Sequence, residues 1–267
     1  MAIQSSNSLP QFFINTPCRV GDCISLSDAD THHAEHVLRL RDGERVRIAY
    51  SAPEVGGKFH SHAFLGVVKK SPAHPLQVVI LEELQVPSAA ILPPPVQALI
   101  FGISKGKKNE LVIEKATELG VQSVILWQTS RSILRLKDEN EAVRRKERFS
   151  KIAEAASKQS KRSSIPSVHI CLTEAALAIE LEQLAHGPRL CCSLSPGSKR
   201  LTEIVCSPEN RMSSIAIGPE GDFSPQEEQW LATKNFSPVR LGENILRSET
   251  AAIAAIAMVH ALCERSL

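Results

Sequence analysis

The chain has 267 residues, of which 43% are hydrophobic and 22% charged, as is ordinary for a globular protein with a substantial core. No apolar run approaches the roughly 18 residues of a membrane span, and the opening MAIQSSNSLPQ lacks the charged start and apolar stretch of a secretory signal. We therefore expect a cytoplasmic protein. Its seven cysteines are odd in number, scattered and without a CxxC pair, which argues against a disulfide scaffold and a zinc cluster.

Positive charge is concentrated in one part of the chain. The net charge is only +2, but residues 105–162 contain 15 Lys and Arg against 8 Asp and Glu, a local balance of 15 − 8 = +7. Such a concentration indicates a polyanionic partner such as nucleic acid, because neutralised phosphates release their counterions. Solvated helix faces that expose Lys and Arg would give the same count, so charge alone leaves both interpretations open.

Residues 12–84 have the pattern of a small β-rich domain. The helix-forming segment DADTHHAEHVLRLRDG interrupts it, with Asp28 or Asp30 as the expected N-cap and Gly43 in the turn that follows. A compact barrel with an inserted helix fits this order, and small barrels of this kind often bind nucleic acid. The apolar or alternating runs lie at Phe12–Ile14, Glu44–Tyr50, Phe59–Val68 and Leu76–Leu84.

Three histidines, His32, His33 and His36, share one face of this predicted helix. Metal binding is one interpretation, but no cysteine or carboxylate ligand set accompanies them in the sequence. We expect instead that they face nucleic-acid phosphates or pack against the domain, and we expect no metal.

The segment VPSAAILPPPV, residues 86–96, breaks both periodicities, and its three consecutive prolines favour an extended connector. We therefore expect one domain at residues 1–86 and a second at residues 96–267.

The second domain alternates strands and helices, which predicts an α/β layer structure with a mostly parallel sheet and ligands at the carboxyl ends of the strands. The order of the strands cannot be read from this pattern. Strands are expected at Val96–Ile103, Ser123–Trp127, Ser167–Cys171, Arg189–Leu194, Ser213–Ile217 and Pro238–Leu241. Helices are expected at Lys108–Leu119, Glu139–Ser160, Thr173–Leu184, Leu201–Cys206, Pro225–Lys234 and Glu249–Leu262.

Two loops in this domain carry the strongest functional pattern, IGPEGDF at 217–223 and LGENILRSETAA at 241–252. Each follows a short apolar run and precedes a helical pattern, so both are expected at the same edge of the sheet. Gly218, Gly221 and Gly242 allow positive φ and close approach to a ligand, and Pro219 stiffens the first turn. Glycine-rich backbone with apolar and polar side chains suits a small amphipathic ligand. Arg247 in the second loop is an arginine available to an anionic partner.

Other ligand and reaction classes lack support. No GxGxxG follows a strand, GISKGKKNE has the wrong spacing for a phosphate-binding Walker loop, and no GxSxG elbow exists. A purely structural interpretation of the two loops stays open: Glu220 could cap the next helix, and Arg247 and Glu249 could form a surface ion pair of little energetic value.

The motifs together resemble the RsmE family, the ribosomal small-subunit RNA uridine-N3 methyltransferases of the SPOUT class. The resemblance rests on GPEGDF and LGENILRSETAA, on KKNELVIEKATELGV at 107–121, on SRS at 130–132, on residues 155–166, and on the opening FFI and HHAEHVLRLRDGERVRI. It implies an N-terminal PUA-like β-barrel that binds RNA and a C-terminal α/β domain with a trefoil knot that holds S-adenosylmethionine. It also implies a homodimer whose partner completes each active site, and a substrate that is 16S ribosomal RNA or the small subunit.

Roles for individual residues follow from the loops and this resemblance. Catalysis is assigned to Arg247, which would stabilise negative charge on the uracil oxygens, with Glu249 or a water molecule removing the N3 proton. Cofactor binding is expected at Leu194, Ile217, Gly218, Pro219, Glu220, Gly221, Leu241, Gly242, Ile245 and Leu246. RNA binding is expected at Lys105, Lys107, Lys108, Arg131, Arg135, Lys161 and Arg162.

The chain departs from the family pattern at one position in each of the two loops. Asp222 stands where the family usually has glycine, and Asn244 where it usually has arginine. Two other functions therefore stay open: a related SPOUT enzyme with another RNA acceptor, such as a ribose 2′-hydroxyl or another base, and a non-catalytic RNA-binding assembly factor.

Overall fold

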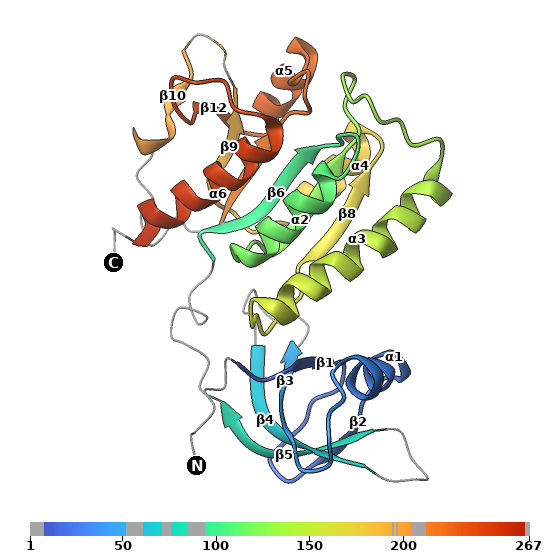
Figure 1. The fold of residues 1–267 in the computed structure, drawn as a ribbon. Coiled ribbons are helices and arrows are strands. Elements are labelled where there is room, and N and C mark those ends of the chain that lie inside the picture. The colour runs from blue at the N-terminus through green and yellow to red at the C-terminus, as the bar shows by residue number, and fades with distance from the viewer. Residues whose placement is uncertain are drawn as a thin grey trace. The chain divides into compact units, whose positions relative to one another are not determined.

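The computed structural model describes residues 8–51, 61–70, 76–84, 94–193, 195, 197–203 and 212–264. Two compact units divide the chain: residues 1–92 together with 157–164, and residues 93–156 together with 165–267 (Figure 1). Residues 85–93, which include most of the predicted connector, lie outside the described residues. Each unit contains a hydrophobic core of its own.

The first unit contains a curled five-stranded sheet in the order β1-β3-β4-β5-β2. Strand β1 pairs in parallel with β3, and the other neighbours are antiparallel. Alternate residues such as Val46 and Ile48 point inward and are fully buried, as a strand with one face on a core requires. This sheet confirms the predicted small β-barrel unit. Its strands are β1 Gln11–Ile14, β2 Cys23–Ser25, β3 Arg45–Ser51, β4 Ser61–Lys69 and β5 Gln77–Leu84.

The helix predicted between β2 and β3 is shorter and less regular than expected. The α-helix α1 covers only Asp28–His32 and continues as the π-helical turn η2, His33–Val37. Its N-cap is Ser27, whose hydroxyl accepts a hydrogen bond from the Asp30 N–H at 3.1 Å, so the assignment of an aspartate as the cap was wrong. Within the described residues no three His, Cys, Asp or Glu side chains gather as metal ligands.

Residues 157–164 belong to the first unit, although they begin within the last turn of the long helix α3, Glu139–Gln159. Lys158 forms an ion pair with Asp30 at 2.8 Å. The Lys161 ammonium donates to the Leu9 carbonyl at 2.6 Å, and the Gln11 side-chain amide donates to the Arg162 carbonyl at 2.6 Å. These partners are at least 128 residues apart in sequence, so no local pattern could have predicted the association.

The second unit is built on a seven-stranded sheet in which every pair of neighbours is parallel. All six predicted strands are present. The short edge strand β10 was not predicted because its two residues are exposed and carry no hydrophobic signal. In sheet order the strands are β10 Lys199–Arg200, β12 Phe236–Arg240, β9 Arg189–Cys192, β11 Ser213–Ile217, β6 Val96–Gly102, β7 Ser123–Trp127 and β8 Ser167–Cys171.

Helices cover both faces of this sheet (Figure 1). Alternate residues of β6 enter two separate cores: Leu99 and Phe101 pack with α2, α3 and α6, while Ala98 and Ile100 pack with α4 and α5. Of the helix predicted at Leu201–Cys206, residues 201–203 form a short 3₁₀ helix, Leu201–Glu203, and residues 204–206 lie outside the described residues. The helices are α2 Lys108–Glu118, α3 Glu139–Gln159, α4 Glu174–Glu182, α5 Pro225–Thr233 and α6 Ser248–Glu264.

The last part of the chain contributes two neighbours of β9 and one helix on each face of the sheet. Strand β11 lies between β9 and β6, β12 lies on the other side of β9, and α6 then returns to pack on α2, β6 and β11. The register aligns the strand ends, because Ile217 pairs with both Phe101 and Cys192, and Val239 pairs with Cys192. The loops after β9, β11 and β12 therefore open at one edge, as predicted. The trefoil knot implied by the resemblance stays a prediction.

Candidate active site

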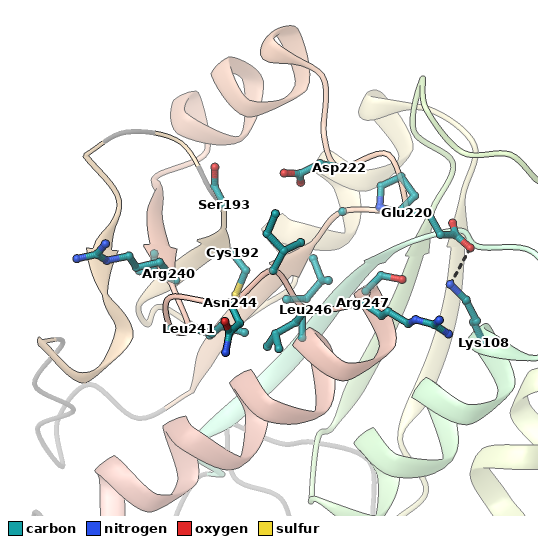
Figure 2. Close-up of a pocket in the computed structure, with 18 residues that line it drawn as sticks. Lys108, Cys192, Ser193, Glu220, Asp222, Arg240, Leu241, Asn244, Leu246 and Arg247 are labelled. Carbon is teal, nitrogen blue, oxygen red and sulfur yellow. Dashed lines mark ion pairs between the residues drawn. The ribbon is translucent and has the colours of Figure 1, made fainter.

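The loops after β9, β11 and β12 surround a cavity of about 440 Å³ at this edge of the sheet (Figure 2). Its size lies within the usual range for small-molecule sites. Apolar groups from the strand ends and the start of α6 form one wall, and charged groups from α2 and the loops form the rim. The lining residues are Lys108, Cys192, Ser193, Ile217, Gly218, Pro219, Glu220, Asp222, Val239, Arg240, Leu241, Gly242, Asn244, Ile245, Leu246, Arg247, Ser248 and Ala251.

The GPEGDF loop needs small residues because backbone segments approach one another closely. A Cβ on Gly102 would overlap Pro219, and a Cβ on Gly218 would lie 2.9 Å from the Asp222 Cα. None of Gly218, Gly221 and Gly242 has positive φ; the left-handed residue of this loop is Asp222, with φ +60°. Glycine in this loop therefore allows backbone segments to approach each other closely. The left-handed turn geometry, which was expected of glycine, is supplied by Asp222.

Helix α5 begins directly behind this loop and holds it in place. Ser224 is the N-cap, and Ser224 and Glu227 form a capping box with Pro225 in the first turn. Glu227 also accepts a hydrogen bond from the Ser130 N–H. The suggested capping role of Glu220 was wrong, because Ser224 and Glu227 satisfy the helix start.

Arg131 fixes the same loop from the segment after β7. Its Nη1 donates to the Gly221 carbonyl at 2.9 Å and to the Phe223 carbonyl at 3.0 Å. A side chain predicted to bind RNA thus has a structural role in the loop that lines the pocket.

Lys108, Glu220 and Glu249 form an ion triad at one end of the pocket, and Figure 2 shows its Lys108–Glu220 pair. The Lys108 ammonium lies 3.2 Å from Glu220 Oε1 and 3.2 Å from Glu249 Oε2. Burial alone would lower the pKa of Lys108, but hydrogen bonds and charges of the two glutamates outweigh it and raise the pKa. Burial opposes ionisation of Glu220 and Glu249, yet their hydrogen bonds and Lys108 lower the pKa of both. The triad therefore stays fully ionised near neutral pH.

Arg247 lines the pocket beside this triad, and its guanidinium extends toward Lys108 (Figure 2). The side chain is exposed, and within the described residues it forms no ion pair. Arg247 is thus a positive charge at the pocket mouth that is available to a ligand. The interpretation of Arg247 and Glu249 as a surface ion pair was wrong, because Glu249 pairs with Lys108.

Cys192 contributes to the apolar wall. Burial raises the pKa of its thiol to about 12, so the thiol stays protonated and is no nucleophile. The six cysteines in the described part of the chain are all free thiols.

The structure brings most of the predicted cofactor residues together. Eight of the ten line the pocket; Gly221 does not, and Leu194 lies outside the described residues. Of the two predicted catalytic residues, Arg247 lines the pocket and Glu249 reaches it through Lys108. Sequence reasoning assigned no role to several other lining residues, notably Cys192, Ser193 and Val239, and it noted Asp222 and Asn244 only as departures from the family pattern. Their positions at strand ends and in the glycine-containing loop were the signal that could have found them.

The predicted RNA-binding residues are scattered. Lys105 and Lys107 are exposed in the loop before α2, whereas Lys108 is paired within the triad. Arg135 is exposed and donates to the Ser130 carbonyl.

The two remaining residues of that set lie in the first unit. Burial lowers the pKa of Lys161 and lowers that of Arg162 to about 10. Arg162 is only partly exposed, in contrast to Lys105 and Lys107.

A parallel α/β sheet whose glycine-containing loops enclose a pocket beside charged groups is a binding site for a small ligand at the carboxyl ends of the strands. Residues 93–260 match the family model described as an RNA methyltransferase domain. The chain belongs to the RNA methyltransferases, and within them to the ribosomal RNA small subunit methyltransferase E family.

Particular relatives support this assignment. The chain is 30% identical to "Ribosomal RNA small subunit methyltransferase E" of Rickettsia conorii, with 94% of this chain and 95% of the relative covered. It is 27% identical to the protein of the same name from Mycobacterium bovis, covering 95% and 92%. The solved structure of ribosomal RNA small subunit methyltransferase E from Neisseria gonorrhoeae, bound to S-adenosyl methionine, is 29% identical, with a TM-score of 0.77 and coverage of 95% and 98%.

Among the described residues, no helix is both long enough and apolar enough to cross a membrane.

Proposed function

We propose that this protein transfers the methyl group of S-adenosylmethionine to N3 of a uridine in 16S ribosomal RNA. The observation that carries the proposal is the pocket at the ends of β9, β11 and β12, since a relative with the same fold and 29% identity binds this cofactor. When bound, S-adenosylmethionine supplies a methyl group already activated by its sulfonium, so the protein must align the acceptor and manage its proton.

The pocket fits such a cofactor in shape and chemistry. Ile217, Leu241, Leu246 and Ala251 offer an apolar surface for the adenosine, and the backbone of the glycine-containing loops offers hydrogen-bonding groups. The protonated Cys192 thiol adds to this surface and does not compete for the methyl group.

Arg247 is the group best placed to act on the acceptor. Uridine N3 carries a proton and becomes a good nucleophile only as that proton leaves, when negative charge develops on the uracil oxygens. An exposed guanidinium at the pocket mouth stabilises this charge.

Glu249 is not the base that removes the N3 proton but a residue that positions the pocket. Its pKa is lowered and its carboxylate is held by Lys108 at 3.2 Å, so it is a weak base. Of the two acceptors considered for the N3 proton, a water molecule is therefore favoured. Glu249, with Glu220 and Lys108, positions the start of α6 and the GPEGDF loop.

The substrate must present an unpaired base, because pairing blocks the Watson–Crick edge that carries N3. The exposed Lys105 and Lys107 lie in the loop just before Lys108 and can hold neighbouring phosphates. A ribosomal substrate would also place the protein in the cytoplasm.

We further propose that two copies form a homodimer that completes each site. The side chains of Ile245 and Leu246 at the pocket rim are 80% and 38% exposed. Apolar groups so exposed beside a ligand pocket favour cover by a partner. Sedimentation at micromolar concentration should give a dimer, and a monomer alone would contradict this part of the proposal.

Mass spectrometry of nucleosides from 16S ribosomal RNA tests the reaction. A strain that lacks the gene should lose N3-methyluridine, and the wild-type gene should restore it. Loss of a 2′-O-methylated nucleoside or of another methylated base would indicate a different acceptor. Unchanged RNA, together with no heat of binding for S-adenosylmethionine, would indicate a non-catalytic RNA-binding protein.

A further inference from the structure

Asp222 combines two unusual properties. It is a non-glycine residue with φ +60°, and it lines the pocket. Its N–H donates to the Pro219 carbonyl at 2.9 Å, and its Oδ1 accepts from the Phe223 N–H at 2.8 Å. The turn therefore holds the carboxylate in one place. Glycine would adopt this backbone at lower cost, so the charged side chain calls for a reason beyond the turn.

A second carboxylate lies on the same side of the pocket. Glu228, on α5, accepts hydrogen bonds from the hydroxyls of Ser193 at 2.7 Å and Ser195 at 3.2 Å. Within the described residues neither Asp222 nor Glu228 forms an ion pair. The positive charge of Arg131 acts on Asp222, but its Nη1 donates to backbone carbonyls of the loop.

The charged groups of the pocket are unevenly placed. The Asp222 carboxylate points toward Ser193, whereas Lys108, Glu220 and Arg247 gather at the far end (Figure 2). Arg240 also lines the pocket, but its guanidinium extends away from Asp222 and lies 3.9 Å from Glu243 (Figure 2). Burial raises the pKa of Asp222; the Phe223 N–H and Arg131 oppose this effect, and the charge of Glu228 adds to it. A carboxylate in such surroundings lacks a positive partner, which a cationic ligand can provide.

We propose that Asp222 is a specificity residue that makes the pocket prefer a ligand with a positively charged sulfur over the same ligand with a neutral sulfur. This inference rests on the proposed function, in which the ligand is S-adenosylmethionine. In the reaction the bond between sulfur and methyl carbon breaks, its electron pair stays on sulfur, and the methyl carbon bonds to uridine N3, whose proton goes to water. The sulfonium thereby becomes a neutral thioether. Asp222 attracts the donor more than the product and so favours release of the product.

Calorimetric titration with S-adenosylmethionine and S-adenosylhomocysteine tests the proposal. The two ligands share the adenosine, ammonium and carboxylate groups, so the ratio of their affinities isolates the charge at sulfur. In Asp222→Asn the side-chain oxygen can still accept from Phe223, and asparagine tolerates positive φ. We expect this variant to bind the donor about tenfold more weakly, about 1.4 kcal/mol, while its affinity for the product changes less than about twofold.

Two further variants guard against indirect effects. Asp222→Gly suits the left-handed backbone and should give the same loss of preference, which separates charge from turn geometry. Glu182→Gln removes an exposed carboxylate on α4 and should leave both affinities unchanged. Thermal melting should show that all three variants are folded.

The outcomes separate this inference from the proposed function. A wild-type protein that binds neither ligand would overturn both. A wild-type protein that binds both ligands, with an Asn variant whose affinity ratio is unchanged, would overturn the role of Asp222 alone. An equal loss for both ligands would also overturn it, because Asp222 would then contact a group that donor and product share.

Discussion

Single charged residues decide the chemistry of this site, and the structure assigns them different tasks from those that residue type alone suggested. Lys108 was predicted to bind RNA but is paired with two carboxylates. Arg131 was assigned the same role but fixes a loop. Arg247 remains the cation that is open to a ligand at the pocket mouth.

Removal of the Arg247 guanidinium should slow methyl transfer without loss of cofactor binding. Arg247→Ala is expected to lower kcat about 100-fold, the usual cost of one donor that stabilises developing negative charge. S-adenosylmethionine affinity should change little, because apolar and backbone groups hold the cofactor. Arg144→Ala, which removes an exposed arginine from α3, is the matched control. Full turnover in the Arg247 variant would remove this residue from the mechanism.

The ion triad should make a pH-dependent contribution to stability. Lys108→Met leaves Glu220 and Glu249 partly buried without their cation, and we expect a loss of about 1–2 kcal/mol, between exposed and buried pairs. The folded-state pKa of both glutamates lies below 4.5. Their contribution is therefore present above pH 4.5 and is lost as pH falls through the folded values.

Urea denaturation of wild type and Lys108→Met between about pH 3 and pH 8 measures the difference in their free energies of unfolding. The gap between the two proteins should be constant near neutral pH and should shrink in acid. Lys115→Met offers a control, since Lys115 pairs with Glu114 and Glu118 on the exposed face of α2. A gap that grew in acid would contradict the sign of the effect.

At the scale of elements, the start of α5 links stability to the pocket. Its N-cap Ser224 and capping-box partner Glu227 follow directly after the GPEGDF loop, and Glu227 also binds the segment after β7. A helix start that is anchored in this way keeps the pocket loop in one conformation.

Two N-cap substitutions separate an effect on protein stability from an effect on cofactor binding. Ser224→Ala and Thr173→Ala each remove an N-cap hydroxyl, from α5 and α4 respectively, and each should cost about 1 kcal/mol of stability. Only Ser224→Ala should also weaken S-adenosylmethionine binding, because only α5 borders the pocket loop. Equal effects of both variants on cofactor affinity would show that loss of stability alone explains the change.

Prediction from the sequence was most successful for elements with a strong periodic signal. Strands β6, β7 and β11 of the second unit are buried along their whole length and rich in apolar residues, and all six predicted strands of this unit were found. The segment at 28–43 was misjudged because the helix widens into a π-turn, which hydrophobic spacing does not reveal.

For the whole molecule, the sequence could predict which loops form the site but could not predict their partners. Lys108 and Glu249 are 249 − 108 = 141 positions apart, and only the return of α6 onto α2 brings them together. The order of the strands and the association of residues 157–164 with the first unit depend on similar long-range contacts.

Binding of the whole protein to RNA should depend steeply on salt, and a few lysines should account for part of that dependence. Lys105 and Lys107 are exposed beside the pocket. If each contacts a phosphate, the Lys105→Gln, Lys107→Gln double variant should reduce the slope of log affinity against log salt by about 1.4 for single-stranded RNA, from about 0.7 per contact. Lys115→Gln should leave the slope unchanged, because two carboxylates already neutralise Lys115. Filter binding to a 16S ribosomal RNA fragment between 50 and 200 mM salt, a range over which phosphate contacts change affinity strongly, measures the slope. An unaltered slope in the double variant would show that the phosphates lie elsewhere on the protein.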